Sequence, residues 1–338
     1  MSPPSVETER PPGSLLNFAW PMYRRVCVVG SIANVLPMNT GGLTQVSARY
    51  TPALMIRNVS VLGSGTMGRG IAYLAAVSGF DTVIFDVDPA VLDAARASIE
   101  STLRKGVEKG KLSAEKASEA IARVHLVPDL EPASSGADLL IEAVSESFEL
   151  KEELFAQADL FCGPETILAS NTSSISISKL AGTVERRDRF IGMHFFNPPH
   201  VMKLIEIVRG ERTSDETVEQ IRAVAEQMGK TPILVRDSPG FATSRLGVAI
   251  GLEAMRMLEE GVASAEDIDR AMELGYNHPM GPLRLTDLVG LDVRLGIAEY
   301  LAATLGPRFE PPQILRDLVA QGKLGKKTGE GFYRWPSE

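Results

Sequence analysis

The sequence predicts a doubly wound α/β domain with a mostly parallel sheet, followed by an all-helical C-terminal domain. Short β-rich runs alternate with helical patterns from Arg57 to residue 236, an order typical of a parallel sheet covered by helices on both faces. The first strand pattern leads directly into a glycine loop. After Ser238-Pro-Gly240 the strand patterns stop and only helical patterns follow.

The strand patterns are short runs rich in β-branched, aliphatic and aromatic residues. They predict strands at Asn58–Leu62, Asp81–Phe85, Val124–Val127, Leu139–Ala143, Ile167–Ser170, Phe190–His194, Leu204–Val208 and Pro232–Val235. Helices are expected between them, among them Met67–Val77, Lys151–Phe161 and Glu216–Met228. The last of these helices begins after a capping box, Thr213-Ser-Asp-Glu216.

One further helix is expected after Asp88, which is a good N-cap residue and is followed by proline in the first turn. Apolar side chains recur there every four residues and predict one buried stripe. The stripe consists of Val91, Ala95, Ile99, Leu103 and Val107.

Three segments are expected: an N-terminal extension (1–56), the α/β domain (57–236) and the helical domain (237–338). The helical domain opens with a long pattern, Phe241–Glu260, that ends at Gly261. Apolar spacing at Val248, Leu252, Met255 and Leu258 is compatible with a homodimer contact, although a monomer's own core would have the same spacing.

Composition limits the classes of function. The 338 residues suit about two domains. With 44% hydrophobic and 23% charged residues, the chain has the composition of a globular protein. A formal charge of −8 and the absence of a 20-residue apolar run argue against nucleic-acid and membrane partners. Cys27 and Cys162 have neither metal-site nor disulfide spacing, so we expect a reducing compartment, the cytoplasm, and no metal site.

Residues 1–54 differ from the rest. They are rich in Pro, Gly and Ser, and no acidic residue occurs between Glu9 and Asp81. Such a segment can be a transit peptide, which would direct the protein to an organelle matrix. Alternatively, translation starts at Met55, because a strand and its glycine loop follow at once.

The glycine loop, Gly63-Ser-Gly-Thr-Met-Gly68, matches the dinucleotide-binding fingerprint of a Rossmann-type domain. Its glycines allow a tight turn and a close backbone approach to a pyrophosphate at the N-terminus of the following helix. Asp86 lies 18 residues after Gly68, at the end of the second strand pattern, where a carboxylate binds the adenosine ribose. Such a carboxylate repels a 2′-phosphate, so NAD is expected rather than NADP. The cofactor-binding candidates are Gly63, Gly65, Thr66, Met67, Gly68 and Asp86; a purely structural turn is the alternative.

His194 and Glu206 are the candidate acid/base pair. His194 ends one strand pattern, a turn containing His200 follows, and Glu206 lies in the next strand pattern. If the two strands fold back on each other, the two side chains become cross-strand neighbours about 5 Å apart. A carboxylate on one ring nitrogen fixes the tautomer and favours the imidazolium that forms when the other nitrogen takes a proton. The alternative is a buried histidine with an incidental glutamate partner. For His125 and His278 we favour structural or surface roles.

Taken together, these motifs resemble the 3-hydroxyacyl-CoA dehydrogenase family from about Asn58 to Trp335. The most specific segments are Ser170-Asn-Thr-Ser-Ser174, Gly192-Met-His-Phe-Phe-Asn-Pro198, Ser238-Pro-Gly-Phe241, His278-Pro-Met-Gly-Pro282 and Gly325-Lys-Lys-Thr-Gly-Glu-Gly-Phe-Tyr333. The resemblance implies NAD-dependent, reversible oxidation of a (3S)-3-hydroxyacyl-CoA, and the length after Met55 is similar to the short-chain, 3-hydroxybutyryl-CoA type. It also implies an acyl-CoA substrate and a homodimer through the helical domain.

The resemblance also implies roles for single residues. His194 matches the family's catalytic base, Glu206 its partner, and Ser173 the residue that binds the reacting oxygen beside the nicotinamide. The implied cofactor contacts are Glu146, Lys151, Asn197 and Lys327, and the implied CoA contacts are Thr102 and Lys109. A basic cluster, Arg104, Lys105, Lys109 and Lys111, fits a polyphosphate, although alone it would be read as a solvated face.

The sequence departs from the family at one substrate position. Ser244 stands where the family commonly has asparagine, and its shorter side chain puts that substrate contact in doubt. Two other functions stay open: a sibling dehydrogenase acting on a free hydroxy acid such as gulonate, and a nucleotide-binding protein without turnover. The basic cluster argues for a CoA substrate, and the intact Ser173, His194 and Glu206 set argues for an enzyme.

Overall fold

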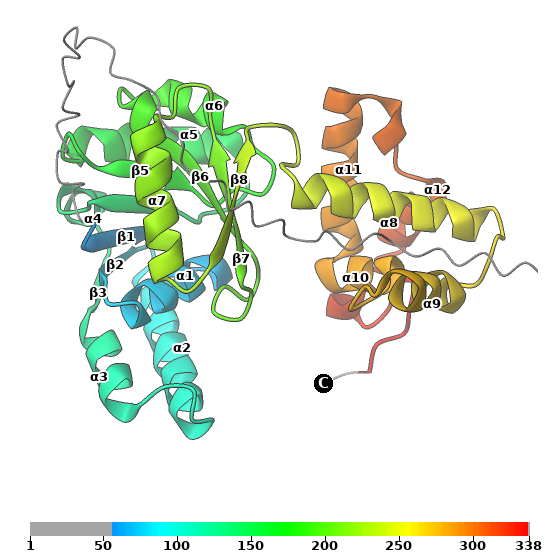
Figure 1. The fold of residues 1–338 in the computed structure, drawn as a ribbon, viewed down its shortest axis with the longest axis horizontal. Helices are drawn as coiled ribbons and strands as arrows, with labels where there is room; N and C mark the ends of the chain where they lie inside the picture. The colour runs from blue at the N-terminus through cyan, green and yellow to red at the C-terminus, as the bar shows by residue number, and fades with distance from the viewer. Residues whose placement is uncertain (1–55, 337–338) are drawn as a thin grey trace, which may run out of the picture. The chain divides into compact units, whose positions relative to one another are not determined.

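The computed structural model describes residues 56–336, so the expectations for the N-terminal extension lie outside the described residues. Its main feature is an eight-stranded sheet with the strand order β3-β2-β1-β4-β5-β6-β7-β8 (Figure 1). The strands are β1 (Asn58–Leu62), β2 (Asp81–Phe85), β3 (Val124–Val127), β4 (Leu139–Glu142), β5 (Ile167–Ser170), β6 (Phe190–Phe195), β7 (Leu204–Arg209) and β8 (Thr231–Arg236). All eight predicted strands are confirmed, with ends that differ by one residue at most.

Neighbouring strands are parallel, with a single exception in the described sheet. β6 and β7 pair antiparallel, because the short connection between them contains no crossover helix. The chain order reverses at β1, which pairs with β2 on one side and with β4 on the other. In sheets of this kind ligands bind beyond the carboxyl ends of the strands at that reversal.

Helices cover both faces of the sheet (Figure 1). The helices of the α/β part are α1 (Thr66–Val77), α2 (Pro89–Glu108), α3 (Ala114–Ala122), α4 (Leu130–Ser135), α5 (Phe148–Phe161), α6 (Ile177–Leu180) and α7 (Asp215–Gln227). Side chains of α1, α2, α3 and α7 share one apolar core with the sheet, and those of α4, α5 and α6 share a second core. Two buried layers on opposite faces are the doubly wound arrangement that the sequence predicts.

The buried stripe of α2 differs from the prediction at both ends, because Val107 is only half-buried and Val91 is exposed. Val91 is 38% exposed, and Leu92 is buried in its place with Ala95, Ile99 and Leu103. A strict four-residue repeat overshoots the 3.6-residue turn and drifts around the helix. The prediction that Val91 belongs to the stripe is therefore wrong.

The described chain after β8 is helical. The helices are α8 (Thr243–Glu259), α9 (Ala265–Tyr276), α10 (Pro282–Val289), α11 (Leu291–Leu305) and α12 (Gln313–Ala320). They form a third apolar core, in which Val248, Leu252 and Met255 are buried and against which Leu258 packs. These four residues therefore belong to the chain's own core and are not a free dimer surface. The exact boundary at residues 236 and 237 stays a prediction.

No helix among residues 56–336 is long and apolar enough to cross a membrane.

Candidate active site

The glycine loop connects β1 to α1, and each glycine of the fingerprint meets a different demand. Gly63 has a φ of +97°, a conformation that side chains other than hydrogen disfavour. A Cβ on Gly68 would lie 1.8 Å from the Gly63 carbonyl oxygen, so only glycine lets the helix start this close to the strand. A Cβ on Gly65 would meet nothing within 4 Å, which leaves open space beside the N-terminus of α1. Thr66 and Met67 form the first turn of that helix. This loop fits the pyrophosphate of a dinucleotide.

Asp86 lies next to the loop, as expected. Its Oδ2 accepts hydrogen bonds from the backbone N–H of Ser64 at 2.9 Å and from the Ser64 hydroxyl at 2.8 Å. Its Oδ1 accepts a longer bond, 3.3 Å, from the N–H of Asp88. Asp86 therefore also holds the glycine loop in place, a structural role that the sequence did not indicate.

His194 and Glu206 face each other across β6 and β7. The register pairs the two residues directly, and His194 Nδ1 lies 2.7 Å from Glu206 Oε2. The predicted cross-strand pairing is confirmed. Because a carboxylate only accepts hydrogen bonds, Nδ1 carries the proton in the neutral ring and Nε2 is left as the proton acceptor.

Glu206 is fully buried, and the start of the helical part completes its contacts. Oε1 accepts from the backbone N–H groups of Ala242 and Thr243, and Oε2 accepts from the Thr243 hydroxyl. Burial alone would raise the pKa of Glu206, but the hydrogen bonds from His194 and Thr243 outweigh it and lower the pKa. The carboxylate is therefore held in its charged form opposite the imidazole.

Aromatic rings surround the imidazole. The ring of Phe196 lies 4.6 Å from that of His194, and the ring of Phe241 lies 5.8 Å away. His194 is 5% exposed and lines a cavity of about 580 Å³. A proton acceptor thus faces a largely apolar cavity, where water competes weakly for its hydrogen bonds.

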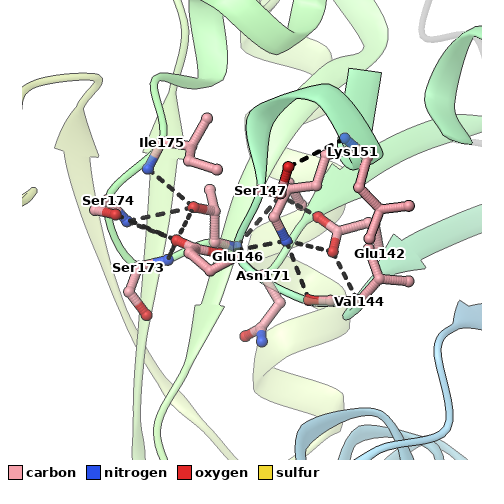
Figure 2. A network of polar contacts seen from close by, with 12 residues as sticks. Glu142, Val144, Glu146, Ser147, Lys151, Asn171, Ser173, Ser174 and Ile175 are labelled. Carbon is pink, nitrogen blue, oxygen red and sulfur yellow. Dashed lines mark hydrogen bonds and ion pairs between the residues drawn. The ribbon is translucent and has the colours of Figure 1, made fainter. Parts of the chain in front are cut away.

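Glu146 organises the loop that carries Ser173 (Figure 2). Its Oε1 accepts hydrogen bonds from the Thr172 hydroxyl at 2.5 Å and from the backbone N–H groups of Ser173 and Ser174 at 3.0 and 3.3 Å. The hydroxyl of Ser173 points away from this network (Figure 2), and Ser173 lines the cavity with His194.

Beside Glu146 lies a buried ion pair that was not expected from the sequence (Figure 2). Lys151 Nζ lies 2.5 Å from Glu142 Oε1 and 3.3 Å from Glu146 Oε2. Glu142 is fully buried and also accepts from the Ser170 hydroxyl and the Val144 N–H. Burial raises the pKa of Glu142, against the opposing effect of Lys151 and these donors. A carboxylate inside an otherwise apolar strand pattern was the available signal, because such a group is rarely buried without a partner.

The cavity brings together seven of the predicted site residues. They are Met67, Glu146, Lys151, Ser173, His194, Asn197 and Ser244. Asn171 also lines it, and the Asn171 Oδ1 accepts from the Phe195 N–H at 2.9 Å, which ties the loop after β5 to the end of β6. This contact of the Asn171 side chain was not expected from the sequence.

Three predicted residues lie elsewhere. Thr102 lines a second cavity of about 240 Å³, together with Thr66 and Asn197, and its hydroxyl donates to the Ser98 carbonyl within α2. Lys109 is exposed at the C-cap of α2. Lys327 pairs with Asp292 at 2.6 Å and does not line the cavity of His194. The structure therefore shows no described contact that connects Lys109 or Lys327 with the glycine loop.

A glycine loop for a dinucleotide and a carboxylate-backed histidine on one cavity define the class of nicotinamide-dependent dehydrogenases. The family model of the 3-hydroxyacyl-CoA dehydrogenase NAD binding domain matches residues 58–238. The family model of the 3-hydroxyacyl-CoA dehydrogenase C-terminal domain matches residues 240–335. The chain belongs to the 3-hydroxyacyl-CoA dehydrogenase family. It is an enzyme, an oxidoreductase with an NAD-binding domain, as the sequence predicts.

Individual relatives agree with this assignment. A probable 3-hydroxybutyryl-CoA dehydrogenase of Bacillus subtilis is 45% identical over 279 residues, 82% of this chain and 97% of the relative. The mitochondrial hydroxyacyl-coenzyme A dehydrogenase of Sus scrofa is 40% identical over 86% of this chain and 94% of its own. The crystal structure of (S)-3-hydroxybutyryl-CoA dehydrogenase from Ralstonia eutropha superposes with a TM-score of 0.81 at 43% identity, covering 83% of this chain and all of the other.

Proposed function

We propose that the chain catalyses the reversible oxidation of a short-chain (3S)-3-hydroxyacyl-CoA, such as 3-hydroxybutyryl-CoA, to the 3-oxoacyl-CoA. The observation that carries the proposal is the buried His194–Glu206 pair, which opens onto the same cavity as Met67 of the glycine loop. Two relatives named for 3-hydroxybutyryl-CoA support the short chain length.

In this mechanism His194 is the base. Its Nε2 takes the proton of the substrate hydroxyl. When NAD is bound, its nicotinamide ring would accept the hydride from C3, so that the hydroxyl carbon becomes the 3-oxo carbon. Glu206 stabilises the imidazolium through the 2.7 Å contact with Nδ1. In the reverse direction the imidazolium returns the proton to the oxygen of the 3-oxo group.

Ser173 is proposed to donate a hydrogen bond to the reacting oxygen, because its hydroxyl faces away from the Glu146 network (Figure 2). Its backbone is fixed by Glu146, so the donor is positioned before substrate arrives. Glu146, Lys151 and Asn197 are proposed contacts to the nicotinamide half of NAD, since all three line the same cavity.

The adenosine half of NAD is proposed to extend past Gly63, Gly65 and Gly68 towards Asp86. The open space at Gly65 and the turn at Gly63 support this path. Asp86 also argues for NAD over NADP, since a fixed carboxylate repels a 2′-phosphate.

For CoA we propose contacts with Thr102 of α2 and with Lys109 at the C-cap of that helix. Thr102 lines the second cavity, and exposed Arg104, Lys105 and Lys109 add positive charge to the same helix and its end. Ser244 lines the cavity of His194 and is a proposed substrate contact, shorter than the family's asparagine. A part of Lys327 in cofactor binding has only the resemblance to the family as support.

A homodimer through the helical part is proposed as well. Leu246 is 63% exposed and Ile250 39% exposed on α8, and Leu288 is 41% exposed on α10. Replacing Leu246 with Glu should lower the molar mass measured by light scattering if this surface holds two copies together. We also propose a cytoplasmic location. If residues 1–54 are a transit segment, the location is an organelle matrix, and N-terminal sequencing of the protein from its own cells distinguishes the two.

The decisive experiment follows NADH absorbance with acetoacetyl-CoA and with free acetoacetate. We expect turnover of the thioester and inhibition by free CoA. Turnover of acetoacetate alone, without inhibition by CoA, would favour a hydroxy-acid dehydrogenase instead. Failure to oxidise NADH with either compound would contradict the proposed substrate.

A further inference from the structure

Arg294 is a buried cation on the wall of the proposed substrate cavity. It lies in the first turn of α11, is 8% exposed, and lines the cavity that contains His194 and Ser244. Its Nε is fully buried and has no hydrogen-bond partner among the described residues. Neither the catalytic proposal nor the resemblance to the family gives this residue a part.

The charge of Arg294 lacks compensation. No carboxylate among residues 56–336 forms an ion pair with it, whereas the other buried cation of the cavity, Lys151, contacts both Glu142 and Glu146. Burial lowers the pKa of the Arg294 guanidinium, yet arginine stays protonated in proteins. A buried charge without a partner is costly, so the site is complete only when an anion binds.

The helix opposite leaves room for the guanidinium. A Cβ on Gly247 of α8 would lie 3.2 Å from Arg294 Nη1 and 3.6 Å from Nη2. Gly247 itself lines the cavity, and so do apolar side chains of α10 and α11: Leu285, Val289, Val293 and Ile297. The wall therefore consists of apolar surface suited to methylene groups and one unpaired cation.

We propose that Arg294 determines specificity by binding a carboxylate of the substrate. A planar guanidinium holds a carboxylate with two parallel hydrogen bonds and cancels its charge. The carboxylate can be the far end of an acyl chain attached to CoA, or the carboxylate of a free 3-oxo or 3-hydroxy acid. This inference rests on the proposed dehydrogenase function, because it assigns Arg294 to the substrate of that same site. It replaces the methyl-ended acyl group of 3-hydroxybutyryl-CoA by a substrate that carries a carboxylate.

A neutral partner fits the observations less well. A thioester carbonyl accepts hydrogen bonds but brings no negative charge, so the buried guanidinium would stay uncompensated. The pyrophosphate of the cofactor is expected at Gly65, on the N-terminus of α1, whereas the wall around Arg294 is made by Ser244 and Gly247 of α8. The substrate is therefore the ligand that meets this charge.

The test compares two thioesters of equal chain length. 3-Oxoadipyl-CoA ends in a carboxylate and 3-oxohexanoyl-CoA ends in a methyl group; free 3-oxohexanoate tests the second source of the carboxylate. For each compound kcat/KM is measured with NADH in the wild type, Arg294→Met and Arg294→Lys. The matched control is Arg270→Met, since Arg270 is exposed on α9 and pairs only with Asp267 among the described residues.

We expect the wild type to prefer 3-oxoadipyl-CoA to 3-oxohexanoyl-CoA. The ratio of the two kcat/KM values should fall about 10- to 100-fold in Arg294→Met, as expected for a lost charge-assisted hydrogen bond, less in Arg294→Lys, and not at all in Arg270→Met. If the carboxylate belongs to a free acid, the wild type should reduce 3-oxohexanoate and Arg294→Met should not. An unchanged ratio in Arg294→Met, with no effect on the free acid, would overturn the inference.

Failure of the inference and failure of the proposed function give different results. A wild type that reduces both thioesters equally well keeps the dehydrogenase function and removes the role of Arg294. A wild type that reduces only the free acid removes the CoA function. If Arg294→Met does not fold, calorimetric Kd values of adipyl-CoA and hexanoyl-CoA for the wild type decide: tighter binding of adipyl-CoA supports the inference, and equal Kd values overturn it.

Discussion

Buried charge is handled differently in the two parts of the molecule. In the α/β part, Glu142 of β4 faces Lys151 of α5 and His194 faces Glu206, and each carboxylate is further hydrogen-bonded by backbone or hydroxyl donors. In the helical part, Arg294 is almost as buried but has no partner among the described residues.

The difference indicates what each part does. Charges that the protein pairs for itself are fixed before any ligand arrives, which suits groups that must hold a reacting atom or a cofactor in place. A charge left unpaired in a cavity is completed by a ligand, which suits recognition. In the proposed mechanism the α/β part carries the chemistry, and in the proposed inference α11 carries part of the specificity.

The largest expected effect follows from removing the base. His194→Gln keeps a side chain of similar size but offers no nitrogen that can take a proton. With acetoacetyl-CoA and NADH, kcat should fall by about two to four powers of ten, the usual contribution of a general acid or base. Far-ultraviolet circular dichroism confirms that the variant folds, and His125→Gln, in an exposed strand position, is the matched control. A nearly unchanged kcat would exclude His194 as the base.

The second largest effect tests the buried Glu142–Lys151 ion pair. Glu142→Gln removes one partner of a fully buried pair, so the free energy of unfolding should fall by about 3–5 kcal/mol, as when either partner of such a pair is lost. Lys151→Met should cost a similar amount, and the double variant should cost less than the sum of the two. Urea titrations of the three variants measure this.

The control for this pair is Glu100→Gln, which breaks the half-exposed contact with Arg96. There the expected loss is about 0–1 kcal/mol. Equal losses for the buried and the exposed variants would show that Glu142 and Lys151 are not coupled in solution.

Most of the fold could be predicted because its signals are local. A strand such as Asn58–Leu62 is apolar, short and bounded by a glycine loop, and the repeated order of strand and helix leaves a parallel sheet as the ordinary solution. The antiparallel step at β7 followed from the short connection after His194. A strict four-residue repeat predicts the wrong face of the helix for Val91, which is exposed while Leu92 is buried.

Contacts within the site could be derived from spacing only where the sequence separation was small, and the more distant site residues were expected from the family resemblance. His194 and Glu206 are 12 residues apart on consecutive strands, so their contact could be derived. Asp86 bonding to Ser64, by contrast, depends on the rotamers of a loop. Arg294 meets Gly247 only through the packing of α8 against α11, and no spacing in the sequence encodes that contact.

A smaller effect concerns how the stability contributed by Glu206, the partner of His194, depends on pH. The folded-state pKa of Glu206 lies below its ordinary value near 4.5, so the ionised carboxylate adds stability above the unfolded pKa. That stability is lost as the pH falls through the lower folded pKa. Compared with Glu206→Gln, the wild type should be more stable by about 1.5–3 kcal/mol at pH 7, the range for a hydrogen bond to a charged group.

Unfolding by urea at several pH values below 5 measures this dependence. The stability difference between wild type and Glu206→Gln should shrink there, while Glu211→Gln, at an exposed position, should show no comparable change. A difference that grows as the pH falls would mean that the folded pKa of Glu206 is raised instead.

The next prediction concerns the free energy of unfolding of Arg294→Met, whose expected change differs in sign from the loss expected at Glu142. Because Arg294 has no partner to lose, Arg294→Met removes a desolvated charge and leaves a side chain of similar length. Without ligand, we expect the free energy of unfolding to change by less than about 1 kcal/mol or to rise, unlike the loss at Glu142. Thermal unfolding of the apo forms measures this, and a loss of several kcal/mol would indicate an internal partner for Arg294.

The smallest effect concerns Lys327, whose pairing with Asp292 resembles a surface salt bridge. Its side chain is 46% exposed, so Lys327→Ala should lower the free energy of unfolding by only about 0–1 kcal/mol, and less at high salt. The family resemblance adds a second readout, since a lysine that contacts NAD would raise the KM for NADH when removed. A slightly lower stability with a constant KM for NADH would mean that Lys327 only pairs with Asp292 of α11, its partner in the structure. A KM for NADH raised several-fold at unchanged stability would instead mean that Lys327 contacts the cofactor.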